Sequence, residues 1–176
     1  MTLISTIPKF TLVTLFINLV PIPLFSFCMS SFFALQCDGC AIFYKKDLFQ
    51  LIEEHDVEFN QPGVELLNRE NVAIIAKLCL KSDPSIQFLV STTHLLYNPR
   101  REDIRLAQIQ ILLSELDRHA QTINSNGQKT YMPVILTGDF NLKPFSAPYT
   151  FLTNGKILIE NCNKLDYFFV FQTRRH

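Results

Sequence analysis

The segment 72–80, Val-Ala-Ile-Ile-Ala-Lys-Leu-Cys-Leu, constrains the fold more than any other part of the sequence. It is apolar at every position except Lys77 and rich in β-branched residues, which is typical of a strand buried on both faces. A sheet that contains such a strand must be covered on both sides. The turn at 81–85 leads into a second apolar run at 86–94, and the two runs predict a β-hairpin.

The rest of the pattern mixes strands with helices. Residues 40–45, 132–137 and 165–171 predict strands, whereas 47–59 predicts only strand pieces and a turn. A helix is expected from about 102 to the loop at 124–127, because apolar residues recur there at helical spacing: Leu106, Ile109, Leu112, Leu113 and Leu116. A shorter helix is expected at 146–154, with Ser146 as N-cap and Gly155 as its stop. Together these predict an α/β fold with two packed mixed sheets flanked by helices.

Charge divides the chain into an apolar head, residues 1–37, and a globular remainder, residues 38–176. Lys9 is the only charged residue before Asp38. The apolar run 10–20 fits a secretory signal or a membrane anchor, although Pro21 and Pro23 stand where a spanning helix would continue. The third interpretation, which ranks first, is that the segment is the product of an incorrect gene model or an alternative start. We expect the head to pack poorly on the remainder, as a lone apolar helix or without defined structure.

Composition excludes several classes of protein. With 48% hydrophobic residues and a formal net charge of zero, the chain is neither disordered nor a basic nucleic-acid-coating protein. Five cysteines at irregular spacing do not form a disulfide framework, and Cys37-x-x-Cys40 lacks the second pair that a zinc site needs. Reduced cysteines favour a cytoplasmic or nuclear location, with membrane attachment or secretion through the head as the alternative.

Polar residues follow two of the predicted strands. Asp139 and Asn141 come after strand 132–137, and two residues apart in extended chain they point the same way. A carboxylate beside a carboxamide suits a hard cation and a phosphoryl group, although an Asx turn explains the same pair. His94 ends strand 86–94, where it is either a phosphate-facing group or a satisfied, half-buried histidine.

A third polar segment, Asn98-Pro-Arg100-Arg101-Glu-Asp-Ile-Arg105, precedes the long helix. Its arginines either clamp phosphates or pair with Glu102 and Asp103 in a solvated first turn. The remaining histidines, His55, His119 and His176, are expected at the surface.

Taken in order, four strings carry a family resemblance: Asp38-Gly-Cys-Ala-Ile-Phe-Tyr-Lys, Arg69-Glu-Asn-Val-Ala, Thr93-His-Leu-Leu-Tyr-Asn-Pro-Arg-Arg101 and Gly138-Asp-Phe-Asn141. They resemble the endonuclease/exonuclease/phosphatase superfamily and, within it, the Angel proteins, which are kin of the deadenylases and nocturnin. The resemblance covers about residues 38 to 171. It implies a four-layer α/β/β/α sandwich and Mg²⁺- or Mn²⁺-dependent hydrolysis of RNA phosphate esters.

The resemblance also implies roles for individual residues. Asp139 matches the aspartate that activates the attacking water and would bind the metal, Asn141 the phosphate-binding asparagine, and His94 the strand-end histidine that faces the scissile phosphate. Asp166, in Leu165-Asp-Tyr, resembles the aspartate that orients the catalytic histidine. The segment that holds Asn98, Arg100 and Arg101 would bind substrate.

Two family motifs have no counterpart in the sequence. No Gln-Glu, whose glutamate is the principal metal ligand, precedes Asp38, and no Ser-Asp-His-Pro follows Asp166. The resemblance therefore implies a domain truncated at both ends, with impaired activity. The expected function is 3′-to-5′ exonuclease action on mRNA poly(A). The alternatives are a non-catalytic remnant that binds RNA or a partner, and a 2′,3′-cyclic phosphodiesterase or phosphatase. No stable membrane partner is expected for the domain, and its oligomeric state is left open.

Overall fold

The computed structural model describes residues 11–12, 25–31 and 39–156. Two helices dominate, α1 (Glu102–Ala120) and α2 (Ala147–Asn154), with a short 3₁₀ helix, η2 (Glu65–Leu67). The strands are β1 (Thr11–Leu12), β2 (Phe25–Ser31), β3 (Gly39–Lys45), β4 (Phe49–Glu58), β5 (Val72–Leu80), β6 (Gln87–His94), β7 (Gln121–Ile123), β8 (Lys129–Tyr131) and β9 (Val134–Asp139). None of the helices within the described ranges is long and apolar enough to cross a membrane.

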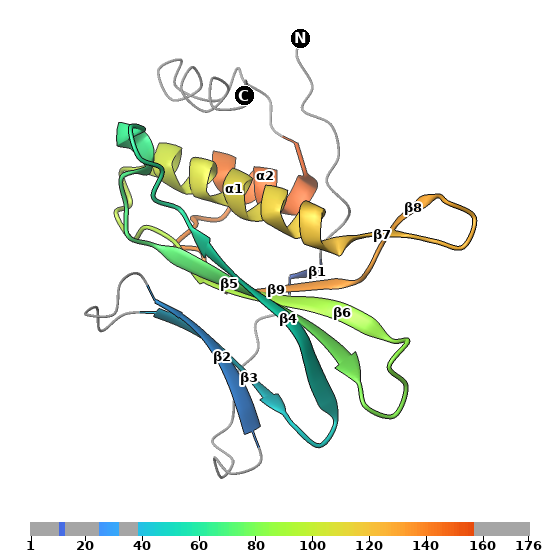
Figure 1. Cartoon of the computed structure of the whole chain (residues 1–176). Coiled ribbons are helices and arrows are strands. Elements are labelled where there is room, and N and C mark those ends of the chain that lie inside the picture. The colour runs from blue at the N-terminus through green and yellow to red at the C-terminus, as the bar shows by residue number, and fades with distance from the viewer. Residues whose placement is uncertain (1–10, 13–24, 32–38, 157–176) are drawn as a thin grey trace.

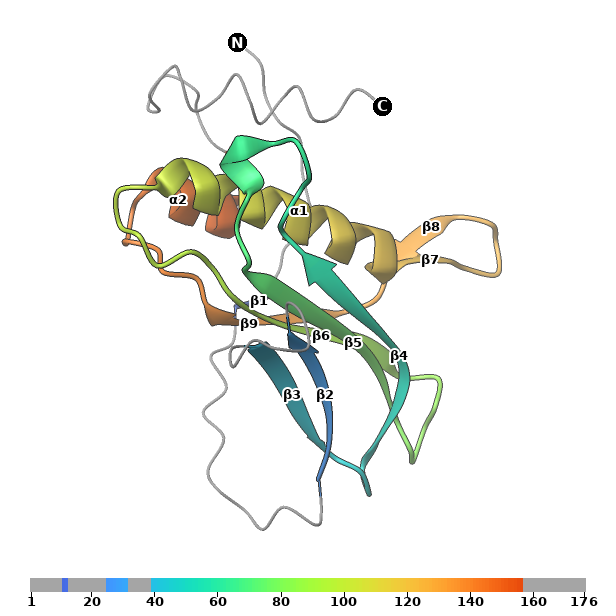
Figure 2. The same cartoon turned by 60° about the vertical axis from the view of Figure 1, so that its left-hand side comes forward.

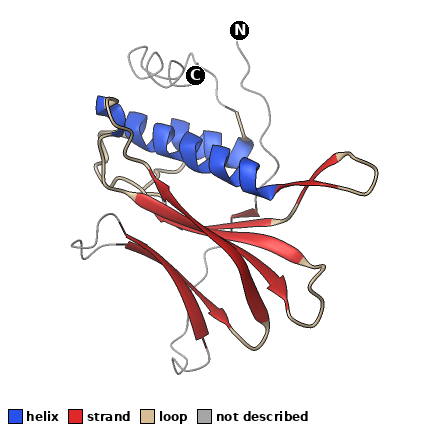
Figure 3. Ribbon diagram, viewed as in Figure 1, coloured by secondary structure: helices blue, strands red, loops and turns tan. Residues whose placement is uncertain are grey.

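The main sheet has five strands in the order β1-β9-β6-β5-β4. The predicted hairpin is confirmed: β5 and β6 are antiparallel, with Ala73 opposite Thr93. Strand β9 lies parallel to β6 on one side and to β1 on the other, and α1 lies on the connection between β6 and β9. The other strand pairs, β2–β3 and β7–β8, form separate two-stranded sheets (Figure 3).

The main sheet is covered on both faces, as segment 72–80 predicts. Figures 1 and 2 show α1 and α2 on one face and the β2–β3 pair on the other. Ala73 and Ile75 belong to the core that includes α1, whereas Ile74 and Ala76 pack with Cys40 of β3. The α/β class is confirmed. The described residues make three layers, α/β/β, of the expected four.

Local signals set the helix ends where the sequence indicates them. The Ser146 hydroxyl accepts a hydrogen bond from the Tyr149 N–H at 3.4 Å, and Gly155 ends α2 in a left-handed conformation, with φ of 69°. Helix α1 buries the five predicted apolar residues. It ends at Ala120, however, earlier than expected. The chain then forms the β7–β8 hairpin around residues 124–127, which lie in the turn of that hairpin.

One expectation about strands is wrong. Residues 49–58 form one strand rather than pieces, because a bulge between Leu51 and Glu53 lets β4 stay paired with β5 along its whole length. In the head, the described residues form strands: β1 pairs with β9, and all seven residues of β2 pair with β3. These segments form hydrogen bonds with backbone N–H and C=O groups at the edges of β9 and β3, which would otherwise lack partners in a sheet. The other head residues lie outside the described part of the chain.

Candidate active site at the ends of β6 and β9

The ends of β6 and β9 bring a histidine and an aspartate together. In the parallel register His94 stands opposite Asp139, and His94 Nε2 lies 3.8 Å from Asp139 Oδ2. Both side chains are about two-thirds exposed, at 63% and 65%. Since residues alternate along a strand, they share the sheet face of Val90, which is the face that β3 covers. We call the His94–Asp139 pair, together with the turn from Asp139 to Asn141, the rim.

Gly138 allows the two strands to approach each other at this point. It stands opposite Thr93 and has φ of 128°, a conformation that side chains rarely adopt. A Cβ atom placed on Gly138 would lie 2.1 Å from the Thr93 carbonyl oxygen. The glycine of Gly138-Asp-Phe-Asn141 is therefore required by the backbone geometry that places His94 beside Asp139.

Asn141 closes the turn that follows Asp139. Its backbone N–H donates to Asp139 Oδ1 at 2.9 Å, and its φ of 49° is left-handed. Its side-chain Nδ2 donates to the Leu95 carbonyl at 2.9 Å. The structure therefore contains the Asx turn that the sequence offered as the alternative explanation. The turn holds the Asp139 carboxylate in place, and the carboxamide retains a second N–H that can donate to a ligand.

A chain of polar side chains, which the sequence did not reveal, supports the end of β6. The Asn71 side chain donates to the His94 carbonyl at 2.9 Å and accepts from Gln108 Nε2 at 3.1 Å. Gln108 is fully buried and accepts from the Leu96 N–H at 3.1 Å, so α1 is tied to both residues that flank Leu95. The sequence signal for this chain of hydrogen bonds is Gln108, a polar residue among the apolar positions of the helix.

The predicted arginine segment divides into structural and exposed members. Arg105 is 1% exposed and donates to the carbonyls of Leu96, Asn98 and Pro99, so it holds the loop after β6 and is not a phosphate clamp. Arg101 pairs with Asp103 at 2.7 Å, as the solvated-turn interpretation predicts. Burial opposes ionisation of Asp103, but the hydrogen bonds from Arg101 prevail and lower the pKa of that carboxyl.

Asn98 and Arg100 also take part in this turn. The Asn98 side-chain oxygen accepts from the Arg100 N–H at 3.0 Å, while Arg100 itself is exposed. Asn98 therefore shapes the loop that presents Arg100.

A cavity of about 690 Å³ opens beside His94. It lies between the start of β3, the segment before β5 and the loop after β6. Tyr97, 78% exposed, forms part of its wall. Burial raises the pKa of the Cys40 thiol in this wall, which favours the neutral form. The lining residues are Gly39, Cys40, Asn68, Arg69, Glu70, Asn71, Val72, His94, Leu95, Leu96 and Tyr97.

Some predicted residues are not at the rim. Asp166, the strand at 165–171 and His176 lie outside the described residues. His55 and His119 were expected at the surface, but the His119 side chain is only 13% exposed and its ring stacks on that of His55. The cause is the packing of the C-terminal end of α1 against β4, which periodicity within either element does not reveal.

Comparison with known proteins adds to this geometry. The chain is 42% identical to protein angel homolog 2 of Danio rerio over 126 residues, covering 70% of this chain and 21% of that protein. It is 37% identical to the structure of ANGEL2, a 2′,3′-cyclic phosphatase, with a TM-score of 0.69 over 78% of this chain and 38% of that one. The human Nocturnin catalytic domain with bound sulfate is 26% identical, with a TM-score of 0.60 over 73% of this chain and 47% of that one.

The chain spans about a fifth of the length of the Danio rerio relative and less than half of either solved chain. Residues 38–175 match the family described as Endonuclease/Exonuclease/phosphatase, which accounts for most of the sequence. ANGEL2 and Nocturnin, the solved relatives at 37% and 26% identity, share its fold. The chain belongs to the endonuclease/exonuclease/phosphatase family.

Proposed function

We propose that this chain supplies part of the active site of a metal-dependent RNA phosphate-ester hydrolase, and that a 2′,3′-cyclic phosphate at an RNA 3′ end is its preferred substrate. The observation that carries the proposal is the pairing of His94 with Asp139 beside the cavity. The choice of substrate rests on ANGEL2, 37% identical, which was solved in complex with adenosine-2′,3′-vanadate.

The rim offers complementary groups for a phosphate ester. Asp139 is an acceptor that would hold and orient an attacking water, and His94 would donate a hydrogen bond to, or protonate, a phosphate oxygen. The second N–H of Asn141 and the guanidinium of Arg100 would bind the remaining oxygens. Tyr97 is exposed at the cavity wall and provides an aromatic face on which a base can stack.

The donor set is compatible with Mg²⁺ or Mn²⁺. Mg²⁺ is commonly held by one or two carboxylates together with waters and substrate phosphates, and Asp139 is an exposed carboxylate of that kind. Such an ion would neutralise charge on the phosphoryl group. Among the described residues no group of three potential metal ligands occurs at the rim, so Asp139 would contribute as one ligand and the substrate as another.

Poly(A)-directed 3′-to-5′ exonuclease action is the second candidate. It is favoured by the kinship of the Angel proteins, which the string Thr93-His-Leu-Leu-Tyr-Asn-Pro-Arg-Arg101 resembles, with the deadenylases. The two candidates differ in the bond that is cleaved. A cyclic phosphatase opens or removes a terminal phosphate and leaves the chain length unchanged, whereas an exonuclease shortens the oligonucleotide. Product length and end chemistry therefore separate them.

The test is a single-turnover assay with the protein in excess over labelled RNA, because this format detects slow reactions. The substrates are one adenosine-rich RNA ending in a 2′,3′-cyclic phosphate and the same RNA with a 3′-hydroxyl, each with Mg²⁺. We expect slow loss of the cyclic end without shortening of either RNA. Asp139→Asn should lower the rate on the order of 10²–10³-fold, the usual cost of removing one group that acts on the transition state.

Glu54→Gln serves as the matched control, since Glu54 is exposed on β4 and away from the rim. Shortening of the 3′-hydroxyl RNA that depends on Asp139 would favour the exonuclease instead. Binding of either RNA without any reaction would favour the non-catalytic alternative, and hydrolysis that Asp139→Asn leaves unchanged would reject the proposed site.

A further inference from the structure

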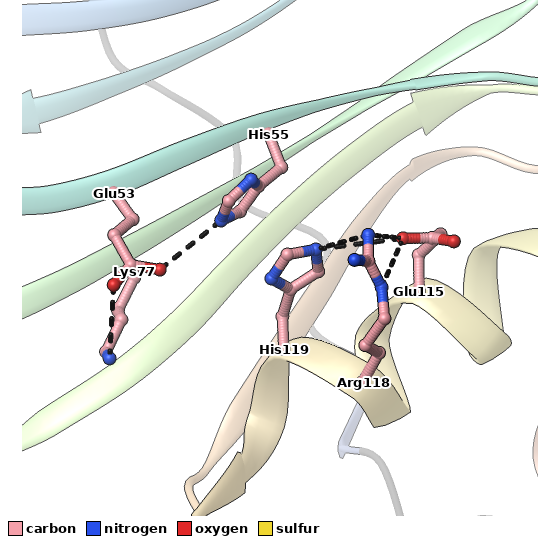
Figure 4. A network of polar contacts seen from close by, with 6 residues as sticks. All are labelled: Glu53, His55, Lys77, Glu115, Arg118 and His119. Atoms are coloured by element: carbon pink, nitrogen blue, oxygen red, sulfur yellow. Dashed lines mark hydrogen bonds and ion pairs between the residues drawn. The ribbon is translucent and has the colours of Figure 1, made fainter.

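A second cluster of histidine and carboxylate side chains lies away from the rim, between β4 and the C-terminal end of α1 (Figure 4). Glu53, His55 and His119 each offer a ligand atom, and these atoms all lie within 4.8 Å of one another. The rings of His55 and His119 stack with centroids 3.7 Å apart, and His55 Nε2 lies 3.3 Å from Glu53 Oε2. Among the described residues this is the one group of three such side chains.

Strand alternation explains why the cluster faces the helix. Glu53 and His55 share a face with Val57, which packs in the core that includes α1. The bulge between Leu51 and Glu53 sets this register. His119 comes from the last turn of α1, so side chains far apart in the sequence meet only because that helix packs on the sheet.

The cluster is separate from the rim. His55 stands opposite Ile75, which stands opposite Ser91, so it lies two strands from β6 and three residues short of His94. Two strand spacings and three residues along the strand together separate the two sites by about 14 Å in the plane of the sheet. The two sites also occupy opposite faces, because Ile75 packs with α1 and Val90, which shares a face with His94, packs with β3.

The side-chain chemistry suits a borderline transition metal rather than Mg²⁺. Two imidazoles and one carboxylate, with a position left for water, form a common zinc donor set. The side chains of Glu53 and His55 are 50% and 34% exposed, so an ion and its water can enter. Tetrahedral zinc with bonds of about 2.0–2.1 Å holds its ligand atoms about 3.3 Å apart. The Glu53–His55 pair already has that spacing.

The groups around the cluster are balanced in charge. Lys77 Nζ lies 3.8 Å from Glu53, and Arg118 donates to His119 Nε2 at 3.0 Å, so two cations face the cluster. Glu115 lies 3.7 Å from the same nitrogen of His119. In the structure this nitrogen accepts from Arg118, which is also bonded to Glu115. Binding of an ion through Nδ1 would require the ring proton to move to Nε2 and Arg118 to release that nitrogen. The Nε2–H could then donate to Glu115, which is the outer-shell arrangement usual for a metal-bound histidine.

We propose that Glu53, His55 and His119 form a Zn²⁺ site that links the edge strand β4 to the C-terminal end of α1, with Glu115 as the outer partner of His119. The ion would tie two elements together on the face opposite the rim, and the position left for water would keep its coordination open. It is independent of the proposed hydrolase function and of the metal that this function uses.

The experiment is calorimetric titration of ZnCl₂ into the whole, untagged chain after treatment with a chelator and in the presence of a phosphine reductant. We expect one site, and an affinity that falls at least ~10–100-fold in both His55→Gln and His119→Gln, since loss of even an outer partner costs about that much. Glu54→Gln, a change on the same strand but on its other face, should leave the affinity unchanged. Zn²⁺ should raise the unfolding temperature of the wild type and not that of the histidine variants.

Co²⁺ absorption provides a second readout, since nitrogen and oxygen ligands give ligand-field bands without thiolate charge transfer. Circular dichroism checks that each variant is folded before titration. Equal Zn²⁺ affinity in the wild type and both histidine variants, thiolate bands in the Co²⁺ spectrum, or no binding by the folded wild type would overturn the proposal.

Discussion

The two faces of the five-stranded sheet carry the same side-chain types, imidazole and carboxylate, in different settings. At the rim, His94 and Asp139 are widely exposed and are positioned by backbone features: a parallel register, a close-approach glycine and an Asx turn. In the cluster, His55 and His119 are positioned by stacking and by the packing of a helix on a strand. At the rim, a fixed backbone holds exposed side chains that a substrate can reach. In the cluster, side chains from two elements converge on one point, as the ligands of an ion do.

If the rim depends on its backbone, Gly138→Ala should have the largest effect. The new Cβ would clash with the Thr93 carbonyl at 2.1 Å, at a φ that alanine disfavours. We expect a loss of about 3–5 kcal/mol in the free energy of unfolding, measured by urea denaturation. Gly127→Ala is the control, because Gly127 also has positive φ, 73°, but has nothing within 4 Å of an added Cβ. Equal losses for the two variants would show that close approach at the rim is unimportant.

Breaking the polar chain through Asn71 and Gln108 should have the next largest effect. Gln108 is fully buried, and Gln108→Leu removes the partner of Asn71 Oδ1 and of the Leu96 N–H, two groups in part-buried hydrogen bonds. Leaving such groups unsatisfied should cost about 1–3 kcal/mol, again measured by urea denaturation. Gln110→Leu, the same change two residues along α1 at a half-buried position, should change stability by less than about 0.5 kcal/mol. A stable Gln108→Leu variant would mean that the rim does not need its tie to α1.

The smallest expected effect concerns the loop that presents Arg100. Asp103→Asn removes a carboxylate that pairs with Arg101 in the first turn of α1, and we expect a loss of about 1 kcal/mol at pH 7. Because the pKa of Asp103 is lower in the folded protein, its stabilisation is complete above the unfolded pKa of about 3.9. It is lost as the pH falls through the folded value.

The difference in stability between the wild type and Asp103→Asn should therefore be constant from pH 7 to about pH 5 and shrink below about pH 4. Asp117→Asn, near the unfavourable C-terminal end of the same helix, should cost nothing or stabilise slightly. A difference that grows on acidification would contradict the assigned direction of the pKa shift.

Features that depend on nearby residues were predictable from the sequence. The β5–β6 hairpin, the buried face of α1 and both caps of α2 follow from local periodicity and capping residues. Gly138-Asp-Phe-Asn141 also marks the rim, because its geometry is local to one turn.

Features that depend on distant residues were not predictable. The strands in the apolar head exist because β3 and β9 offer edges to pair with, which no pattern within the head indicates. The Asn71–Gln108 bond and the His55–His119 stack join residues from different elements, and only the packing of α1 brings them together. Periodicity cannot specify such pairs because it describes one element at a time.

The most direct test of the account is nuclear magnetic resonance of the imidazole nitrogens, in which each of the four histidines gives its own signals. Adenosine 2′,3′-cyclic phosphate with Mg²⁺ is added first, and Zn²⁺ alone is added to a second sample. His→Asn variants assign the signals. We predict that the nucleotide shifts the signals of His94 but not those of His55 and His119, and that Asp139→Asn weakens this response. Zn²⁺ should shift the signals of His55 and His119 and leave those of His94 in place. A nucleotide that moves His55 and His119 while His94 stays unchanged would contradict the assignment of the rim as the active site.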